Sequence, residues 1–129
     1  MADDSIARGG ADEAADDEAW LMANLPPRLT GLPMIVWVQE RGGARHDVRV
    51  KVNPTHGPRV DYRNLVSVAV RPVPRVTPPG QLNAADFGAV SDWIALNRAT
   101  IIDYWDGTIY TDEMLQRLLR RWNGHFRDN

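Results

Sequence analysis

The fold is decided by the stretch Arg45-His46-Asp47-Val48-Arg49-Val50-Lys51-Val52, in which valines alternate with charged residues. Successive side chains of a β-strand point to opposite faces, so the three valines share one face and the charged residues share the other. Such alternation is typical of a strand with one face in a core. It predicts the middle strand of a small antiparallel sheet, with the valines buried and the charges pointing outward.

Two neighbouring segments have the composition of strands that would pair with this one. Residues 34–40 are rich in isoleucine, valine and tryptophan, and residues 64–71 carry a valine at every second position from Val66. The glycines within residues 41–44 suit a tight hairpin, because glycine adopts positive φ readily. Residues 72–80 contain four prolines, which predict a stiff extended connector after the third strand.

The apolar spacing after residue 83 is typical of a long amphipathic helix. Asn83 is a good N-cap, and Asp86 falls in the first turn, where a negative charge suits the helix dipole. The expected end is at Asp106-Gly107, since glycine commonly follows a helix. Apolar residues recur on one face at spacings of 3, 4, 7 and 4, namely Phe87, Val90, Ile94, Ile101 and Trp105.

These elements together predict an α+β fold: a three-stranded antiparallel β-meander packed on one long C-terminal helix, with short flanking helices. The flanking helices are expected at residues 18–25 and at 111–122, with Thr111 as the second N-cap. The length of 129 residues suits one domain, which we place at residues 18–122. A disordered acidic tail, 1–17, should precede it, and a basic tail, 123–129, should follow.

The net charge of −2 conceals an acidic head and a basic body. The first 20 residues hold seven acids against Arg8 alone, and from residue 21 onward 14 bases exceed 10 acids. The head is either a solubilising tail or a segment that lies over the arginine surface and competes with a polyanionic partner. Deleting residues 1–17 should strengthen nucleic-acid binding at low salt if the second reading is right.

The composition excludes several classes of protein. Without cysteine there can be no disulfide, thiolate metal site or cysteine nucleophile. No apolar run approaches the ~18 residues of a membrane span, and the N-terminus is acidic where a secretory signal would be basic. We therefore expect a cytoplasmic protein with no membrane partner. The three histidines show no metal-ligand spacing, so we expect neither a metal site nor a cofactor.

An arginine-rich sheet face is the first candidate for a functional surface. Guanidinium groups bind phosphates bidentately, so a nucleic-acid partner is physically sensible. Alternatively, this face is simply solvated by its charges: no aromatic residue is interleaved with the arginines, and Asp47 would repel a phosphate. The candidate anion-binding residues are Arg41, Arg45, Arg49, Lys51, Arg63, Arg71 and Arg75.

His46 is the single candidate catalytic residue, because a histidine beside a carboxylate can act as a general base. Adjacent strand residues point to opposite faces, however, so His46 and Asp47 cannot easily hydrogen-bond to each other. We expect an interaction protein rather than an enzyme.

Two residues of the predicted helix need an explanation. Arg98 falls in the middle of the apolar face, so it should either pair with a carboxylate or be turned to solvent by a local bend. Trp93 and Leu96 lie off that face and form an apolar patch. The last helix covers this patch, or the patch docks a partner or a second copy.

The segment His46-Asp47-Val48-Arg49-Val50-Lys51, followed by Trp93-Ile94-Ala95-Leu96-Asn97-Arg98, resembles the small bacterial proteins grouped as domain of unknown function 4160. The resemblance covers about residues 34–106. Genes of that family often lie beside a small partner gene in toxin–antitoxin-like pairs. Its strand usually reads His-x-His, whereas this chain has one histidine there. As structural or interaction residues the resemblance carries over Trp93, Asn97, Arg98 and Trp105, beside Arg45, His46 and Arg49.

Two classes of function follow. The first is a non-catalytic interaction module that acts through a protein partner in a toxin–antitoxin-like or mobile-element setting, with a homo-oligomer left open. The second is a nucleic-acid-binding or RNA-acting toxin that uses the arginine-rich sheet face, with His46 as its proton-transfer group.

Overall fold

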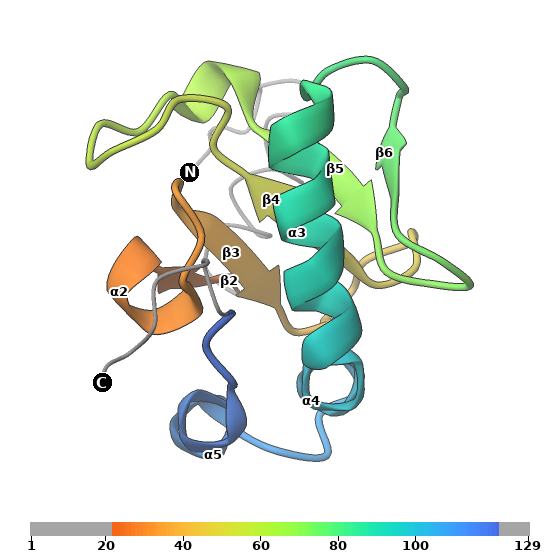
Figure 1. The fold of residues 1–129 in the computed structure, drawn as a ribbon. Helices are drawn as coiled ribbons and strands as arrows, with labels where there is room; N and C mark the ends of the chain where they lie inside the picture. Colours follow the sequence, from red (N-terminus) through yellow and green to blue (C-terminus); the bar gives the residue numbers. More distant parts are fainter. Residues whose placement is uncertain (1–21, 122–129) are drawn as a thin grey trace, which may run out of the picture.

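The computed structural model describes residues 22–121, which fold into one antiparallel sheet with helices packed on one face (Figure 1). The sheet order β2-β3-β4-β5-β6 is also the chain order. Its strands are Met22–Leu25 (β2), Val36–Gln39 (β3), Arg49–Val52 (β4), Val66–Ala69 (β5) and Arg75–Thr77 (β6). The helices are Pro27–Thr30 (α2), Ala84–Leu96 (α3), Arg98–Trp105 (α4) and Thr111–Arg117 (α5), with a 3-10 turn, η1, at Tyr62–Asn64. The predicted tails, 1–17 and 123–129, lie outside the described residues.

The inner three strands are the ones that the valine alternation predicts. In β4, Val50 and Val52 are buried, and Arg49 and Lys51, which alternate with them, are half-buried. The β4–β5 register places Val50 opposite Val68, so the valines of neighbouring strands lie on the same face. That face packs against α3, where Val90 and Ile94 are fully buried (Figure 1).

The prediction of a three-stranded meander is wrong, because the sheet has two further strands. Residues 22–25, expected as a helix, pair with β3, and Leu25 of that strand is fully buried. Residues 75–77, expected as a connector, pair with β5. The prolines around β6 do not prevent this pairing, since they fall outside the paired residues and an edge strand leaves one side without ladder bonds.

The prediction of one long helix is also wrong, because the helix is interrupted at Asn97. The Asn83 cap is confirmed: its side chain accepts a hydrogen bond of 2.8 Å from the backbone N–H of Asp86. At Asn97 the backbone leaves helical geometry, with φ −113° and ψ 17°, and α4 then continues to Trp105. The break changes the direction of the chain, so α4 does not continue the face of α3 (Figure 1).

The last helix is shorter than predicted and its first residue differs. Thr111 is the first helical residue rather than the N-cap, and its hydroxyl lies 2.9 Å from the hydroxyl of Tyr104 on α4. The helix ends at Arg117, and Leu118 is already extended. The chain then returns toward α2 as an extended segment, residues 118–121.

Within residues 22–121, no helix combines the length and the hydropathy that crossing a bilayer would require.

Candidate functional site: an arginine-lined cavity

Asn97 joins the helices to the extended segment 118–121. The oxygen of its side-chain amide accepts a hydrogen bond of 2.7 Å from the backbone N–H of Leu119. Its Nδ2 donates to the backbone carbonyls of Leu119, at 3.0 Å, and Trp93, at 3.1 Å. The amide of Asn97 is 2% exposed and pairs with Leu119 as a neighbouring strand would. This pairing explains why the helix breaks at Asn97 rather than at a glycine or proline.

The other end of the segment is attached to the loop after α2. The backbone N–H of Arg121 donates to the carbonyl oxygen of Thr30 at 2.6 Å, and Nε of Arg120 donates to the carbonyl of Arg28 at 3.2 Å. Gly31 has φ +78°, and a Cβ at this position would overlap the carbonyl oxygen of Arg121. Glycine is therefore required at position 31 both for its backbone conformation and for the close approach.

We predict that Gly31→Ala detaches the segment 118–121 and lowers the free energy of unfolding by about 2–3 kcal/mol, through the combined effects of strain and displaced hydrogen bonds. Gly80→Ala is the matched control, because Gly80 has φ +88° but open space around its missing Cβ. Gly80→Ala should lower the free energy of unfolding by only about 1 kcal/mol, the cost of holding alanine at a positive φ. Urea denaturation compares the two, and equal losses would show that the contact with Arg121 contributes nothing.

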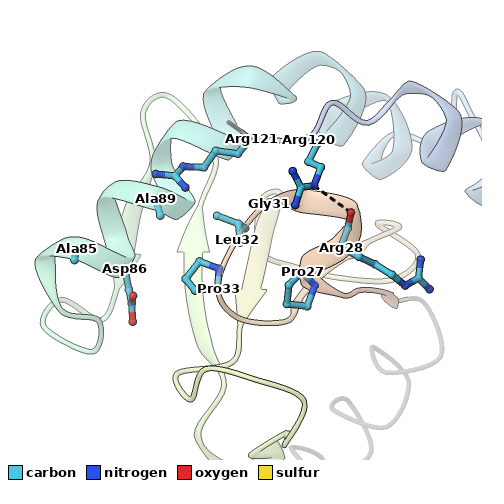
Figure 2. Close-up of a pocket in the computed structure, with 10 residues that line it drawn as sticks. All are labelled: Pro27, Arg28, Gly31, Leu32, Pro33, Ala85, Asp86, Ala89, Arg120 and Arg121. Atoms are coloured by element: carbon cyan, nitrogen blue, oxygen red, sulfur yellow. Dashed lines mark hydrogen bonds between the residues drawn. The ribbon is translucent and has the colours of Figure 1, made fainter. Parts of the chain in front are cut away.

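The segment forms one wall of a cavity of about 470 Å³ between α2 and α3 that is widely open to solvent (Figure 2). Leu32, Pro33 and Ala89 supply apolar lining. The charged lining residues are Arg28, Arg120, Arg121 and Asp86. We call this cavity the arginine pocket.

The basic and acidic side chains of the arginine pocket differ in whether they have partners. No salt bridge joins the three arginines to an acidic side chain within residues 22–121. Asp86, by contrast, is largely buried and engaged on both oxygens: Oδ1 lies 2.9 Å from Nε2 of His56, and Oδ2 accepts from Nδ2 of Asn83 at 3.3 Å. The positive charges of the pocket are therefore the ones available to a ligand.

His56 anchors the loop between β4 and β5 to the start of α3. The loop is organised by Asn53, which is fully buried and whose Nδ2 donates to the carbonyl of Arg59 at 2.7 Å. Its Oδ1 accepts from the N–H of Asp61 at 3.1 Å. The His56 side chain is 56% exposed while its Asp86 partner is buried. A histidine oriented by a buried carboxylate can transfer protons, but here the contact also serves to hold the loop.

The arginine-rich sheet face is not the open surface that the sequence predicts. Lys51 lies opposite Trp37 in the β3–β4 register, so both side chains lie on the face away from the valines. Trp37 is 4% exposed, and Gln39 on the same face is 2% exposed. An aromatic residue does lie beside the basic row, since Trp37 is opposite Lys51 and contacts Tyr62 with ring centroids 6.1 Å apart, but Trp37 is too buried to serve as a stacking platform.

The other predicted anion-binding residues come from several elements, and some of them are neighbours on the sheet. Arg41 and Arg45 lie in the β3–β4 connection, Arg63 in η1 and Arg75 in β6. Arg71 is held by Asp47 through two hydrogen bonds of 2.8 Å, from Nε and from Nη2. Arg49 of β4 and Arg75 of β6 both lie opposite Ala69 of β5, so they share the sheet face of Lys51, and Arg71 already has an anionic partner.

The hydrogen bonds from Arg71 lower the pKa of Asp47 from 3.8 to about 2. A lowered pKa in the folded state means that this ion pair stabilises the fold above about pH 4, and that the contribution is lost as the pH falls through about 2. Because the pair is exposed, we expect Asp47→Asn to cost less than about 1 kcal/mol at pH 7. Stability measured from pH 7 to 2 should fall less steeply in Asp47→Asn than in the wild type; parallel curves would contradict the pairing.

The remaining predicted residues serve mainly in packing. Nδ1 of His46 donates to the carbonyl of Asp47 at 2.8 Å, and its ring centroid lies 5.5 Å from that of the buried Trp105. Trp93 is fully buried, so it belongs to the core. Arg98 is exposed and makes no salt bridge to an acidic side chain of residues 22–121. Of the two alternatives for Arg98, the structure therefore has the local bend, at Asn97, that turns the side chain to solvent.

Sequence reasoning missed the arginine pocket. Its lining comes from residues 27–33, 85–89 and 120–121, and no short-range spacing connects these segments. The predicted helix at 111–122 places Arg120 and Arg121 in its last turn, whereas the helix ends at Arg117. Only Asn97 carried a signal, since asparagine is a poor residue for the interior of a long helix.

A scan against protein-family models, a search of curated proteins and a search of solved structures found no match to this chain. Membership of domain of unknown function 4160 therefore stays a prediction from short motifs.

Proposed function

We propose that this chain is a non-catalytic interaction module that binds a partner protein through three exposed leucines, Leu96, Leu115 and Leu119. We call them the leucine surface. Their exposed fractions are 47%, 42% and 54%. The observation that carries the proposal is that Asn97 joins the end of α3, which carries Leu96, to the segment with Leu119 that follows α5.

The contacts of Asn97 place Leu96 and Leu119 at the same end of the molecule. Leu96 precedes Asn97 in the chain, and the backbone of Leu119 is hydrogen-bonded to the Asn97 side chain. Leu115 lies on α5, four residues before Leu119, and α5 lies at the same end of the molecule as the end of α3 (Figure 1). A single exposed leucine is ordinary, but several at one place mark an interaction site.

The neighbouring charges define the partner further. Arg98 follows Asn97 and Arg120 follows Leu119, and both side chains are exposed. A partner segment with apolar side chains and flanking acidic residues would complement this surface. A toxin–antitoxin-like gene pair, implied by the resemblance, is the setting that we propose for such a partner.

Affinity capture from the native cytoplasm tests the proposal. Leu119→Glu should abolish recovery of the partner, while Val73→Glu, at a residue that is 62% exposed in the β5–β6 connection, should retain it. Both variants should melt at the wild-type temperature, because neither side chain is buried. Equal recovery by both would contradict the proposal. A dimer that Leu119→Glu dissociates would assign the leucine surface to a second copy instead.

The alternative, a nucleic-acid-acting toxin that uses the sheet face and His46, has weaker support. Trp37 and Gln39 on that face are buried, and Nδ1 of His46 is bonded to a backbone carbonyl. Expression of the wild type and His46→Ala in a host without the partner separates the two functions. We expect both to be harmless, whereas toxicity that His46→Ala removes would favour the toxin.

A further inference from the structure

We infer that the arginine pocket binds a small organic phosphomonoester, with the phosphate on Arg120 and Arg121 and the organic group on the apolar lining. Arg120 also borders the leucine surface, but this inference does not depend on the function proposed for that surface. A cavity of about 470 Å³ is within the range of small-molecule sites, which is about 300–1,000 Å³.

The charges of the pocket match a dianion. Figure 2 shows the guanidinium groups of Arg120 and Arg121 at the cavity and that of Arg28 turned outward at its rim. Neither Arg120 nor Arg121 forms a salt bridge with an acidic side chain of residues 22–121. Their two positive charges would balance a phosphomonoester, which carries about −1.5 to −2 near pH 7. A single carboxylate would leave one of them unbalanced.

Asp86 also lines the pocket, and its charge would oppose an anion. Its carboxylate points away from the guanidinium groups of Arg120 and Arg121 in Figure 2. Its oxygens are engaged by His56, at 2.9 Å, and by Asn83, at 3.3 Å. We therefore place the phosphate at the arginine end of the cavity and the organic group between that end and Asp86.

The backbone that carries the two arginines is held in place without a ligand. The N–H of Arg121 is bonded to Thr30, and Nε of Arg120 to the carbonyl of Arg28. On the other side of Arg120, Leu119 is paired with Asn97. Fixing these groups in advance lowers the entropy that binding must remove. The planar guanidinium of Arg121 can then bind two phosphate oxygens at once.

The apolar lining explains why an organic ester should bind better than free phosphate. Leu32, Pro33 and Ala89 present carbon atoms to the cavity. An aromatic or aliphatic group on the phosphate would cover this surface and remove it from water. The pocket thus has a charged end for recognition and an apolar wall for affinity.

Isothermal titration of the full chain with phenyl phosphate, benzoate and inorganic phosphate tests the inference. Phenyl phosphate should bind with one site per chain, at least tenfold more tightly than either of the others. Equal binding of benzoate would overturn the preference for phosphate, and equal binding of inorganic phosphate would overturn the role of the apolar wall. No heat above dilution at millimolar phenyl phosphate would overturn the site altogether.

Variants locate the site. Arg120→Gln combined with Arg121→Gln should weaken phenyl phosphate at least tenfold, and Arg121→Lys, which keeps the charge but loses the planar fork, should weaken it less. Arg98→Gln is the matched control, because Arg98 is an exposed arginine outside the cavity, and it should bind as the wild type does. Unchanged binding by the double variant, or equal weakening by Arg98→Gln, would place the ligand elsewhere. Arg121→Lys alone provides the test if the double variant fails to fold.

Discussion

Replacing Trp93 with alanine should lower the free energy of unfolding by about 3–5 kcal/mol, because truncating a fully buried tryptophan leaves a large cavity. The Trp93 side chain is 0% exposed and belongs to the same core cluster as Val50 and Val68 of the sheet. Urea denaturation followed by circular dichroism measures the loss. A cost below about 1 kcal/mol would show that Trp93 lies at the surface rather than in this core.

Trp93→Phe is the informative control. Among the described residues, Nε1 of Trp93 has no hydrogen-bond acceptor although it is buried. Phenylalanine removes that unpaired N–H and keeps much of the ring, so no polar partner is left behind. We therefore expect less than half of the destabilisation of Trp93→Ala. Equal losses in the two variants would mean that the indole N–H makes an interaction of its own.

Replacing Asn97 with alanine should cost about 2–4 kcal/mol, the second largest effect that we predict. The substitution removes the three hydrogen bonds of the Asn97 side chain. The N–H and carbonyl of Leu119 and the carbonyl of Trp93 then lose this hydrogen-bond partner. The helices should remain, because α3 is held by its own core contacts. Denaturation measures the global loss, and faster proteolysis after Arg117 than in the wild type would locate it.

Asn97→Asp separates hydrogen bonding from packing at the same position. Aspartate keeps an oxygen that can accept a hydrogen bond from the N–H of Leu119. Its second oxygen replaces Nδ2, however, and would face the carbonyl oxygens of Leu119 and Trp93 without a proton to share. Burial and carbonyl dipoles should raise the pKa of this carboxyl. A raised pKa stabilises the fold at low pH, so the stability of Asn97→Asp should recover as the pH falls toward 4. The absence of such recovery would argue against these hydrogen bonds.

The central strands could be predicted because their pattern is local. Valines at 48, 50 and 52 alternate with charged residues, and this period belongs to a strand with one buried face. The edge strands could not be predicted in the same way. Met22–Leu25 is as long as the inner strands but does not alternate apolar and polar residues, and the three residues of Arg75–Thr77 lie between prolines. Both strands depend on hydrogen bonds to a neighbour that the local sequence does not specify.

The break at Asn97 illustrates how tertiary contacts override a local pattern. Residues 84–105 carry apolar residues at helical spacing on both sides of the break, with no glycine or proline at position 97. The deciding partner is Leu119, which is 22 residues further along the chain. The outward position of Arg98 follows from this break. The helix pattern alone therefore predicts neither the break nor the exposure of Arg98.

The sites depend on even longer contacts. The arginine pocket needs Gly31 to admit Arg121, and His56 needs Asp86, which is 30 residues away. The sequence marks these residues as polar or small but does not pair them. The sheet face could not be predicted for another reason: the alternation in β4 gives the charges of one strand only, whereas Trp37 of β3 lies on the same face.

The measurement that tests this account most directly is amide hydrogen exchange at Leu119 and Arg121, in the wild type and in Asn97→Ala. The N–H of Leu119 is bonded to Asn97 and that of Arg121 to Thr30, so both should be protected well above the level of an open chain in the wild type. In Asn97→Ala, protection of Leu119 should fall to that of an unstructured peptide, while Val50 and Val68 in the sheet keep theirs at low denaturant. Unprotected amides at Leu119 and Arg121 in the wild type would contradict the account, because the leucine surface and the arginine pocket both depend on this segment being held.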